Sequence, residues 1–316
     1  MDFLAQYGLF ALKALTSVIA ILVLFAGLLA LGKKNKPKLE ITPLNKQYNE
    51  LKHRMYHEIK GHKLKKEKKK KKEKTLKDKP SLYVLDFHGD IKASQVEQLR
   101  EVITAILSIA QKNDEVVLRL ESPGGSVNGY GLAASQLQRI RDRQIPLTVC
   151  IDKVAASGGY LMSCVANRIV AAPFAIIGSI GVVAQLPNFH RWLKKNNIDV
   201  ELITAGEYKR TLTMLGENTE KGRKKFQEEI EKIHHAFRDY VFVHRQQLDI
   251  DQVSTGEHWL ATDAYNLKLV DYLKTSDDYI IEKMNDFNVF KINRPSKPSI
   301  TEKLFKPALN VLQPWS

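Results

Sequence analysis

The chain has 316 residues, of which 44% are hydrophobic and 17 are glycine, and this composition excludes a collagenous or wholly disordered protein. Its formal net charge of +14 is concentrated in one segment, because residues 33–80 hold 19 Lys and Arg against 6 Asp and Glu. Two cysteines, Cys150 and Cys164, exclude a disulfide framework, and neither belongs to a C-x-x-C pair.

The N-terminal segment, residues 1–32, predicts a membrane anchor. Residues 14–31, ALTSVIAILVLFAGLLAL, are uncharged and mostly apolar, and as a helix they would span about 27 Å, close to the thickness of a bilayer core. A cleavable signal peptide is the alternative, because residues 30–32 loosely resemble a small-x-small cleavage site. Asp2 near the N-terminus and the length of the apolar stretch favour a retained single-pass anchor.

Residues 33–80 predict a basic, low-complexity linker. Four lysines follow the anchor whereas Lys13 alone precedes it, so the positive-inside rule places the body in the cytoplasm. Residues 63–79 contain eleven lysines and no aromatic residue, which is typical of a disordered spacer. Base stacking needs aromatic side chains, so we expect this run to bind anionic lipid and not nucleic acid.

Residues 81–285 predict one α/β domain with largely parallel strands, because strands alternate with helices. The helices are expected at 93–112, 127–142 and 219–247, the last opened by Thr219. The strands are expected at 81–89, 115–122, 145–152, 168–173 and 199–206. The remaining residues, 286–316, contain four prolines and read as a C-terminal tail.

Glycine- and serine-rich turns between the strands gather the candidate chemistry. Ser157 opens a helix in VAASGGY, so the N–H of Gly158 could stabilise an oxyanion there. The Pro-Gly-Gly turn offers the bare backbone of Gly124 and Gly125 as a second donor. Ser157 lacks the G-x-S-x-G elbow of the α/β-hydrolases, because Ala155 stands where that motif has glycine.

The residues alone do not identify the general base that would take the proton of Ser157. A histidine would complete a triad, and the candidates are His190, His234, His235, His244 and His258. A lysine can replace histidine when burial lowers its pKa. Lys209 follows a strand and a glycine turn, but composition alone does not distinguish it from the other lysines.

Four motifs in order, LESPGGSV, DKVAASGGY, GSIGVV and TAGEYKRTLTMLGENT, closely resemble the signal peptide peptidase A family of membrane-bound serine proteases. The anchor and the lysine-rich linker look like its SohB-type branch. The resemblance implies a bacterial inner-membrane peptidase with the spiral of ββα units found in the ClpP and crotonase superfamily. Family members of this type work outside the cytoplasmic membrane, whereas the lysines after the anchor predict a cytoplasmic body, so the side that the peptidase domain faces stays open. The resemblance implies no metal or cofactor. It also implies a homo-oligomer, a ring or dome in which catalytic dyads are completed across neighbouring protomers.

The resemblance also implies a role for each site residue. Ser157 would be the nucleophile and Lys209 the general base, with Ser179 orienting the lysine ammonium. Gly124 and Gly158 would form the oxyanion hole, supported by Gly125. The expected substrates are hydrophobic, unfolded or signal-peptide-like peptides.

Three other functions remain open. The same fold could perform acyl-CoA chemistry, although enzymes of that kind rely mainly on carboxylates. A ClpP-like Ser-His-Asp protease is disfavoured because no histidine falls where that arrangement would place one. A catalytically idle, membrane-tethered scaffold would keep the serine and the lysine without using them.

Overall fold

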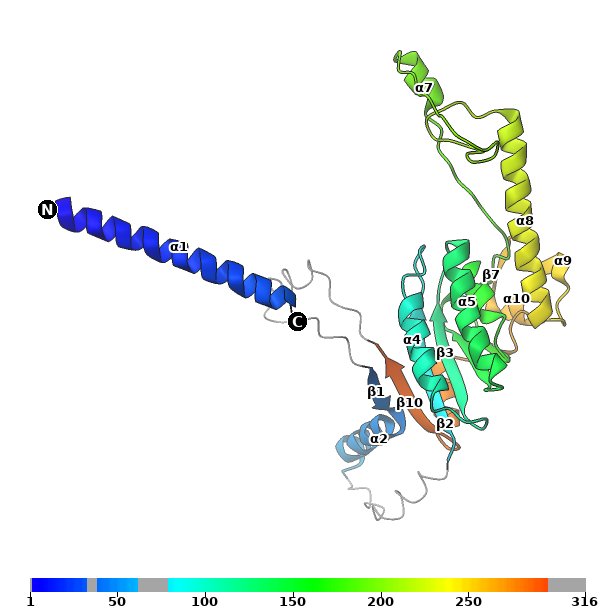
Figure 1. Ribbon diagram of the computed structural model, residues 1–316. Helices are drawn as coiled ribbons and strands as arrows, with labels where there is room; N and C mark the ends of the chain where they lie inside the picture. The colour runs from blue at the N-terminus through cyan, green and yellow to red at the C-terminus, as the bar shows by residue number, and fades with distance from the viewer. Residues whose placement is uncertain (1, 33–38, 62–78, 295–316) are drawn as a thin grey trace. The chain divides into compact units, whose positions relative to one another are not determined.

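The computed structural model describes residues 2–32, 39–61 and 79–294 (Figure 1). The chain divides into two units, one of residues 1–38 with 295–316 and the other of residues 39–294. The described part of the first unit is helix α1, Asp2–Gly32, which contains the expected anchor. Among the described residues, however, no helix has both the length and the apolar character needed to cross a membrane, and the anchor is therefore not confirmed.

The second unit contains two sheets. The larger sheet has seven strands in the order β1-β10-β2-β3-β4-β6-β9, all parallel except the β1–β10 pair. Its strands in chain order are β1 (Glu40–Pro43), β2 (Ser81–His88), β3 (Glu115–Glu121), β4 (Leu147–Ile151), β6 (Arg168–Ala171), β9 (Tyr272–Leu273) and β10 (Asn288–Asn293). The smaller sheet has the order β5-β7-β8, with strands β5 (Val154–Ala156), β7 (Ile176–Gly178) and β8 (His258–Leu260).

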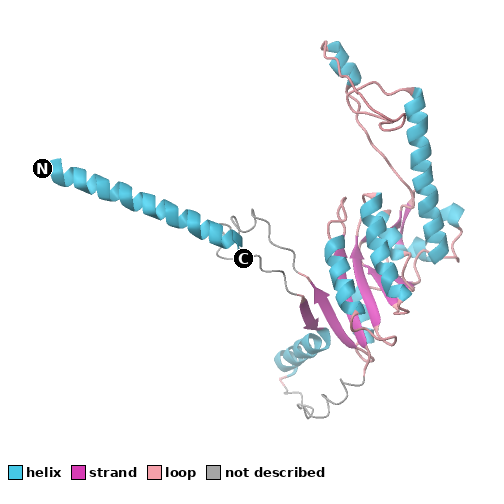
Figure 2. Cartoon of the chain, viewed as in Figure 1, coloured by secondary structure: helices cyan, strands magenta, loops and turns pink. Residues whose placement is uncertain are grey.

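Helices pack on both faces of the larger sheet, and those on one face lie in front of the strands in Figure 2. Side chains alternate between the faces of a strand. On β2, accordingly, Leu85 and Phe87 join the main core under α4 (Val96–Leu107) and α5 (Val127–Asp142), whereas Leu82 and Val84 face α11 (Ser276–Lys283). The remaining helices are α2 (Leu44–Lys60), α6 (Gly158–Ser163), α7 (His190–Lys195), α8 (Glu220–His244), α9 (Ile250–Val253) and α10 (Ala261–Asn266). The expected α/β class is confirmed.

The chain alternates between the two sheets. It passes from β4 in the larger sheet to β5 in the smaller sheet and then into α6. It then repeats the step from β6 to β7. A spiral of strand–strand–helix units predicts this alternation, although the assignment to the ClpP and crotonase superfamily stays a prediction.

The compact unit extends beyond residues 81–285 at both ends. β10 lies between β1 and β2, with Val289 opposite Leu82 and Ile41 opposite Ile292. Part of the segment expected as linker, namely β1 and α2, therefore belongs to the same unit, as does the first part of the expected tail. Lysine-rich residues 62–78 and the rest of the tail lie outside the described residues.

Most expected elements are present, but one strand prediction is wrong. α5 has the expected bounds, and the Thr219 side chain caps α8 by accepting from the N–H of Gly222 at 3.1 Å. Residues 199–206 are not a strand in this structure. Their alternation of apolar and polar residues resembles a strand, but no described strand lies beside them to share backbone hydrogen bonds.

Residues 181–219, here called the arm, connect the smaller sheet to α8. The arm and the N-terminal end of α8 stand clear of the larger sheet (Figure 1). The arm is held together by polar contacts within it. For example, the side-chain amide of Asn188 donates to the carbonyl oxygens of Thr213 and Gly216 at 2.8 and 3.0 Å. Eleven of its apolar side chains are exposed, and they are Val183, Leu186, Phe189, Trp192, Ile198, Val200, Leu202, Ile203, Tyr208, Met214 and Leu215.

Candidate active site

Two strand ends meet at the candidate active site. β3 leads into Ser122 and the Pro-Gly-Gly turn, and β5 runs directly into Ser157. Ser122 donates its N–H to the oxygen of Val154 at 2.8 Å and accepts at its own oxygen from Ala156 at 3.0 Å. This parallel bridge extends the smaller sheet by one residue and places the glycine turn alongside the serine.

Gly124 lies directly against Ser157. A Cβ atom added at Gly124 would lie 2.7 Å from the Cβ of Ser157, 2.8 Å from the oxygen of Ala156 and 2.9 Å from the nitrogen of Gly158. Its backbone φ of 93° also favours glycine. The structure therefore brings three of the expected site residues, Gly124, Ser157 and Gly158, into contact.

Ser157 has a strained backbone. Its φ is 52° and its ψ is −117°, a conformation that residues with a side chain rarely adopt. Strain of this kind costs about 1–3 kcal/mol and is concentrated at functional sites. It turns the chain sharply from β5 into α6, which resembles the strand–turn–helix geometry of a nucleophile elbow although the G-x-S-x-G sequence is absent.

Ser179 stands beside Ser157 at the end of the adjacent strand. β5 and β7 are parallel, with Ala156 opposite Gly178, and the N–H of Ser157 donates to the oxygen of Gly178 at 2.8 Å. Ser179 also has a φ of 52°, and its N–H donates to the oxygen of Glu257 at 2.6 Å. The two serines expected from the sequence are therefore neighbours at the carboxyl ends of β5 and β7.

A buried hydroxyl pair supports the glycine turn, and it was not anticipated from the sequence. The Oγ of Ser122 lies 2.6 Å from the phenol oxygen of Tyr130, which donates to the carbonyl of Asp90 at 2.9 Å. Burial raises the pKa of Tyr130, so the phenol stays protonated and can donate. The only signal for this pair is the tyrosine one turn into α5, and nothing in the sequence places it beside Ser122.

The Ser122 hydroxyl also affects the expected oxyanion hole. It accepts a hydrogen bond from the N–H of Gly124 at 3.1 Å, so this expected donor already has an acceptor. The amides of Gly125 and Gly158 have no acceptor among the described residues. The ring of Tyr130 lies under Gly158, because a Cβ at Gly158 would come within 2.3 Å of it.

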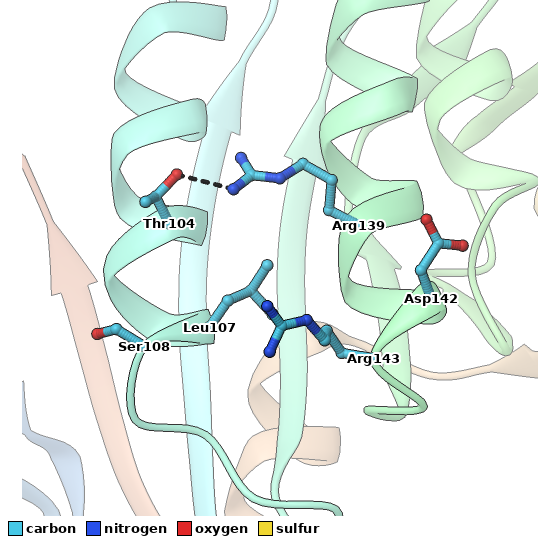
Figure 3. Close-up of a pocket in the computed structure, with 6 residues that line it drawn as sticks. All are labelled: Thr104, Leu107, Ser108, Arg139, Asp142 and Arg143. Atoms are coloured by element: carbon cyan, nitrogen blue, oxygen red, sulfur yellow. Dashed lines mark hydrogen bonds between the residues drawn. The ribbon is translucent and has the colours of Figure 1, made fainter.

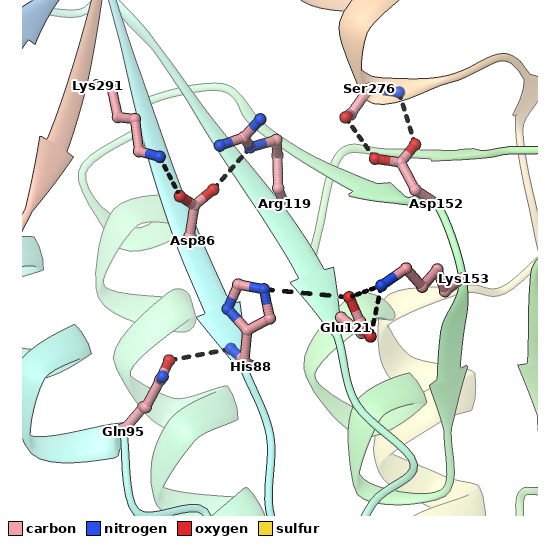
Figure 4. Close-up of polar contacts among 9 residues, drawn as sticks. All are labelled: Asp86, His88, Gln95, Arg119, Glu121, Asp152, Lys153, Ser276 and Lys291. Carbon is pink, nitrogen blue, oxygen red and sulfur yellow. Dashed lines mark hydrogen bonds and ion pairs between the residues drawn. The ribbon is translucent and has the colours of Figure 1, made fainter. Parts of the chain in front are cut away.

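Charged side chains tie together the two strands that lead into the site (Figure 4). The ammonium of Lys153, just before β5, lies 3.1 Å from both carboxylate oxygens of Glu121, the last residue of β3. His88 lies 4.0 Å from the same carboxylate. These groups are largely exposed, so each pair contributes little, about 0–1 kcal/mol.

Lys209 is not brought to Ser157 within one chain. It lies in the arm with its side chain exposed, next to Tyr208, whose ring packs under the ammonium of Lys225 near the start of α8. α6 packs against α8 near its other end, around Val241. Because the helix rises about 24 Å between Lys225 and Val241, the expected base and nucleophile lie at opposite ends of α8.

Two of the five candidate histidines, His234 and His244, are held by hydrogen bonds to other parts of the chain. His234 contacts the oxygen of Ser254 at 2.9 Å, and His244 contacts the oxygen of Tyr240 and the side chain of Gln138. His235 is exposed on α8, and His190 is the first residue of α7. His258 lies opposite Gly178 across the β7–β8 pair and is exposed. None of the five has a described contact with Ser157.

Two other features lie apart from this site. A groove of about 380 Å³ between α4 and α5 is lined by Thr104, Leu107, Ser108, Arg139, Asp142 and Arg143 (Figure 3). Asp142 in this groove lies about 18 Å along α5 from Tyr130. Cys150 and Cys164 are buried, and burial raises the pKa of both thiols, so neither is a reactive nucleophile.

Two family models match almost the whole chain. The model described as peptidase family S49 N-terminal matches residues 2–137, and the model described as peptidase family S49 matches residues 139–289. "Probable protease SohB" of Haemophilus influenzae is 48% identical, covering 100% of this chain and 97% of the relative. "Probable protease SohB" of Buchnera aphidicola subsp. Acyrthosiphon pisum is 50% identical, covering 96% and 93%. A solved membrane-bound stomatin-specific protease aligns with a TM-score of 0.48 at 16% identity, covering 69% of this chain and 99% of that one, a similarity too low to transfer any residue.

Proposed function

The chain belongs to peptidase family S49, and on that premise we propose that it is a serine endopeptidase in which Ser157 is the nucleophile and Lys209 the general base. The observation that carries the proposal is the strained Ser157 held against Gly124 and Gly158. The same family membership supports the expected motif roles, because the four motifs that define them lie within the matched residues.

The chemistry follows from these groups. The hydroxyl oxygen of Ser157 attacks the carbonyl carbon of the scissile peptide while its proton passes to the neutral amine of Lys209. The tetrahedral oxyanion is stabilised by backbone N–H groups, and its collapse releases the amine product, which takes the proton from the lysine. Water then attacks the acyl-enzyme by the same route and frees the serine.

For the oxyanion hole, the amide of Gly158 is one donor. The second comes from the Pro-Gly-Gly turn. Gly124 could serve only by giving up its hydrogen bond to Ser122. The amide of Gly125, which has no acceptor in the described part of the chain, is better suited to bind the oxyanion. This assignment changes the expected role of Gly125 from a supporting residue to a donor.

The position of Lys209 supports a dyad formed between protomers of a homo-oligomer. In one chain the lysine is exposed on the arm, together with eleven exposed apolar side chains. A neighbouring protomer could cover those side chains and receive the lysine at its own Ser157. Burial in that contact would disfavour the ammonium and so favour the neutral amine that a base requires.

The proposed location is the bacterial inner membrane. Residues 14–31 are uncharged and mostly apolar, which supports a single-pass anchor, and residues 33–80 carry the basic charge that favours a cytoplasmic body. An enzyme held at that surface would act on hydrophobic, unfolded or signal-peptide-like peptides released there. Fusing reporters that are active on one side of the membrane after residue 80 tests the orientation.

The deciding experiment is complementation in the full chain. Ser157→Ala and Lys209→Ala carry different affinity tags, are co-expressed, and are purified on both tags in detergent so that only mixed oligomers remain. Each variant alone should fail to cleave casein. The mixed oligomers should recover about a quarter of wild-type activity, because half the sites carry each intact residue. Lys195→Ala, an exposed lysine of the same arm, should keep full activity.

The other outcomes separate the alternatives. Inactive mixed oligomers beside an active wild type would show that both residues must belong to one chain. An active Lys209→Ala variant, with activity lost in His258→Ala, would replace the dyad by a serine–histidine arrangement. An assembled wild type that cleaves nothing would leave the idle scaffold.

A further inference from the structure

α2 contacts the rest of the compact unit through residues at its start. The side chain of Asn45 accepts from the N–H of Val289 at 2.7 Å and donates to the oxygens of Met284 and Phe287 at 3.3 and 3.1 Å. Leu44 packs on the core cluster under α11. Beyond this attachment, every residue from position 49 to the end of the helix is exposed.

α2 carries an apolar stripe that is exposed from Leu51 onward. Tyr48, Leu51, Met55 and Ile59 recur at spacings of three or four residues, which places them on one face of the helix. The exposed fractions of Leu51, Met55 and Ile59 are 57%, 53% and 67%. Within the described residues, nothing covers this face, so it is suited to contact a partner that is apolar and extended.

The rest of α2 is basic. Its charged residues comprise four Lys and Arg against two Glu, and they are Lys46, Lys52, Arg54, Lys60, Glu50 and Glu58. Helical periodicity places Lys52 and Arg54 on opposite flanks of the apolar stripe. In the sequence, residues 63–79 continue the positive charge with eleven lysines.

Together these features select one kind of occupant. Nucleic acid would satisfy the charge but leave the apolar stripe in water. A second copy of α2 could bury the stripe, but it would bring the same basic flanks against each other. An anionic lipid surface satisfies both, since acyl chains take the apolar face and headgroups take the flanking cations.

We propose that α2 lies in the interface of an anionic lipid leaflet, with Leu51, Met55 and Ile59 inserted among the acyl chains. Interfacial helices of this kind bury their apolar face by about 5–10 Å. Because α2 is tied to β10 through Asn45, the helix would hold the compact unit at a fixed depth beside the lipid. The proposal does not depend on peptidase activity.

The test uses the full chain and measures how deeply two positions around α2 lie in the membrane. Ile59→Cys and His53→Cys are labelled with an environment-sensitive fluorophore and reconstituted into vesicles of phosphatidylcholine with or without phosphatidylglycerol. Positions 59 and 53 lie about 120° apart around the helix, and position 53 is nearly opposite Met55 at the centre of the stripe. Labelling is selective because Cys150 and Cys164 are buried. A lipid carrying a nitroxide in its acyl chain then quenches only fluorophores inside the membrane.

We expect quenching at position 59 to exceed that at position 53 severalfold in vesicles with phosphatidylglycerol, and to fall when that lipid is omitted or when Met55→Glu is added. Equal quenching at the two positions would overturn the proposal, because a tether alone brings both faces near the lipid. A blue shift at position 59 without nitroxide quenching would also overturn it, since a protein partner would then cover the stripe. Casein hydrolysis, measured on the same vesicles, reports the peptidase separately.

Discussion

Ser157 and Ser179 end neighbouring parallel strands with the same backbone φ of 52°, and they are joined through a hydrogen bond from Ser157 to the oxygen of Gly178. Each serine is thus held by backbone contacts of the smaller sheet. Strained residues persist only where the surroundings fix them, and here the register of β5 against β7 does so.

The first prediction concerns this strain. Ser157→Gly and Ser157→Ala should both lack proteolytic activity, but the glycine variant should be more stable by about 1 kcal/mol because glycine accepts a positive φ. The free energy of unfolding in urea, measured for both variants in the same detergent, provides the comparison. An alanine variant that is the more stable of the two would show that the backbone at position 157 is relaxed.

A second prediction compares two glycines. Gly158→Ala should lower stability by about 1–3 kcal/mol, because its Cβ would meet the ring of Tyr130 at 2.3 Å. Gly131→Ala is the control, since a Cβ there meets nothing within 4 Å and the position lies inside α5. It should be neutral or stabilising by up to about 1 kcal/mol. Thermal unfolding should separate the two, and similar melting temperatures would contradict the packing of Tyr130 under Gly158.

Tyr130→Phe should lower kcat more than it raises KM. Loss of the phenol removes the contacts to Ser122 and to the oxygen of Asp90, and costs about 1 kcal/mol of stability. The freed Ser122 hydroxyl can then rotate, which loosens the glycine turn beside Ser157. Peptide hydrolysis at several substrate concentrations measures both constants. A change confined to stability would mean that the tyrosine serves the core alone.

The arm provides a fourth prediction. Ile203 is 90% exposed, so Ile203→Asp should leave the fold of each protomer intact while it weakens assembly and activity together. Ile109→Asp is a matched control, because Ile109 is 64% exposed in the turn after α4, outside the arm. Sedimentation velocity in detergent measures the oligomer. Full assembly of the Ile203 variant would exclude this part of the arm from the contact.

A fifth prediction concerns acid. Burial opposes the ionisation of Asp86, but hydrogen bonds from Arg119 and Lys291 outweigh it and hold the pKa of Asp86 below its ordinary value of 3.8 (Figure 4). The stability that this group contributes is therefore present above about pH 4 and is lost as the pH falls through the folded-state pKa. Asp86→Asn should cost roughly 1–3 kcal/mol at pH 7 and progressively less as the pH falls below about 4.

Urea unfolding at several pH values checks this dependence. Glu201→Gln changes an exposed carboxylate that has no ion pair among the described residues, and it should leave the pH dependence unchanged. A loss in Asp86→Asn that is the same at pH 3 and pH 7 would show that the carboxylate is not ionised in these contacts.

Local patterns predicted the layered part of the fold well. The α5 helix and the Thr219 cap were read from short-range signals, which depend on neighbouring residues alone. Residues 199–206 have the alternation of a strand but lie exposed in the arm, because a strand also needs a partner that alternation does not specify. β10 was missed for the converse reason, since its place between β1 and β2 is set by pairing over more than 200 residues of sequence.

The candidate site also contains contacts that the sequence could predict and contacts that it could not. Ser157, Gly124 and Gly158 come together because they follow adjacent strand ends, a relationship that the order of turns in the sequence already suggests. The pairing of Ser122 with Tyr130 could not be predicted, because it depends on where the first turn of α5 crosses β3. If the proposed dyad forms between protomers, the partner of Lys209 is likewise set by packing that a single chain does not contain.

The separation of Lys209 from Ser157 along α8 has a consequence for the cell that makes this protein. If the dyad forms only between protomers, a newly synthesised chain is inactive until it assembles, and this activation requires no cleavage. Proteolysis would then rise steeply with the local concentration of the enzyme, and dilution would switch it off reversibly. Abundance, more than any inhibitor, would set the threshold at which degradation begins.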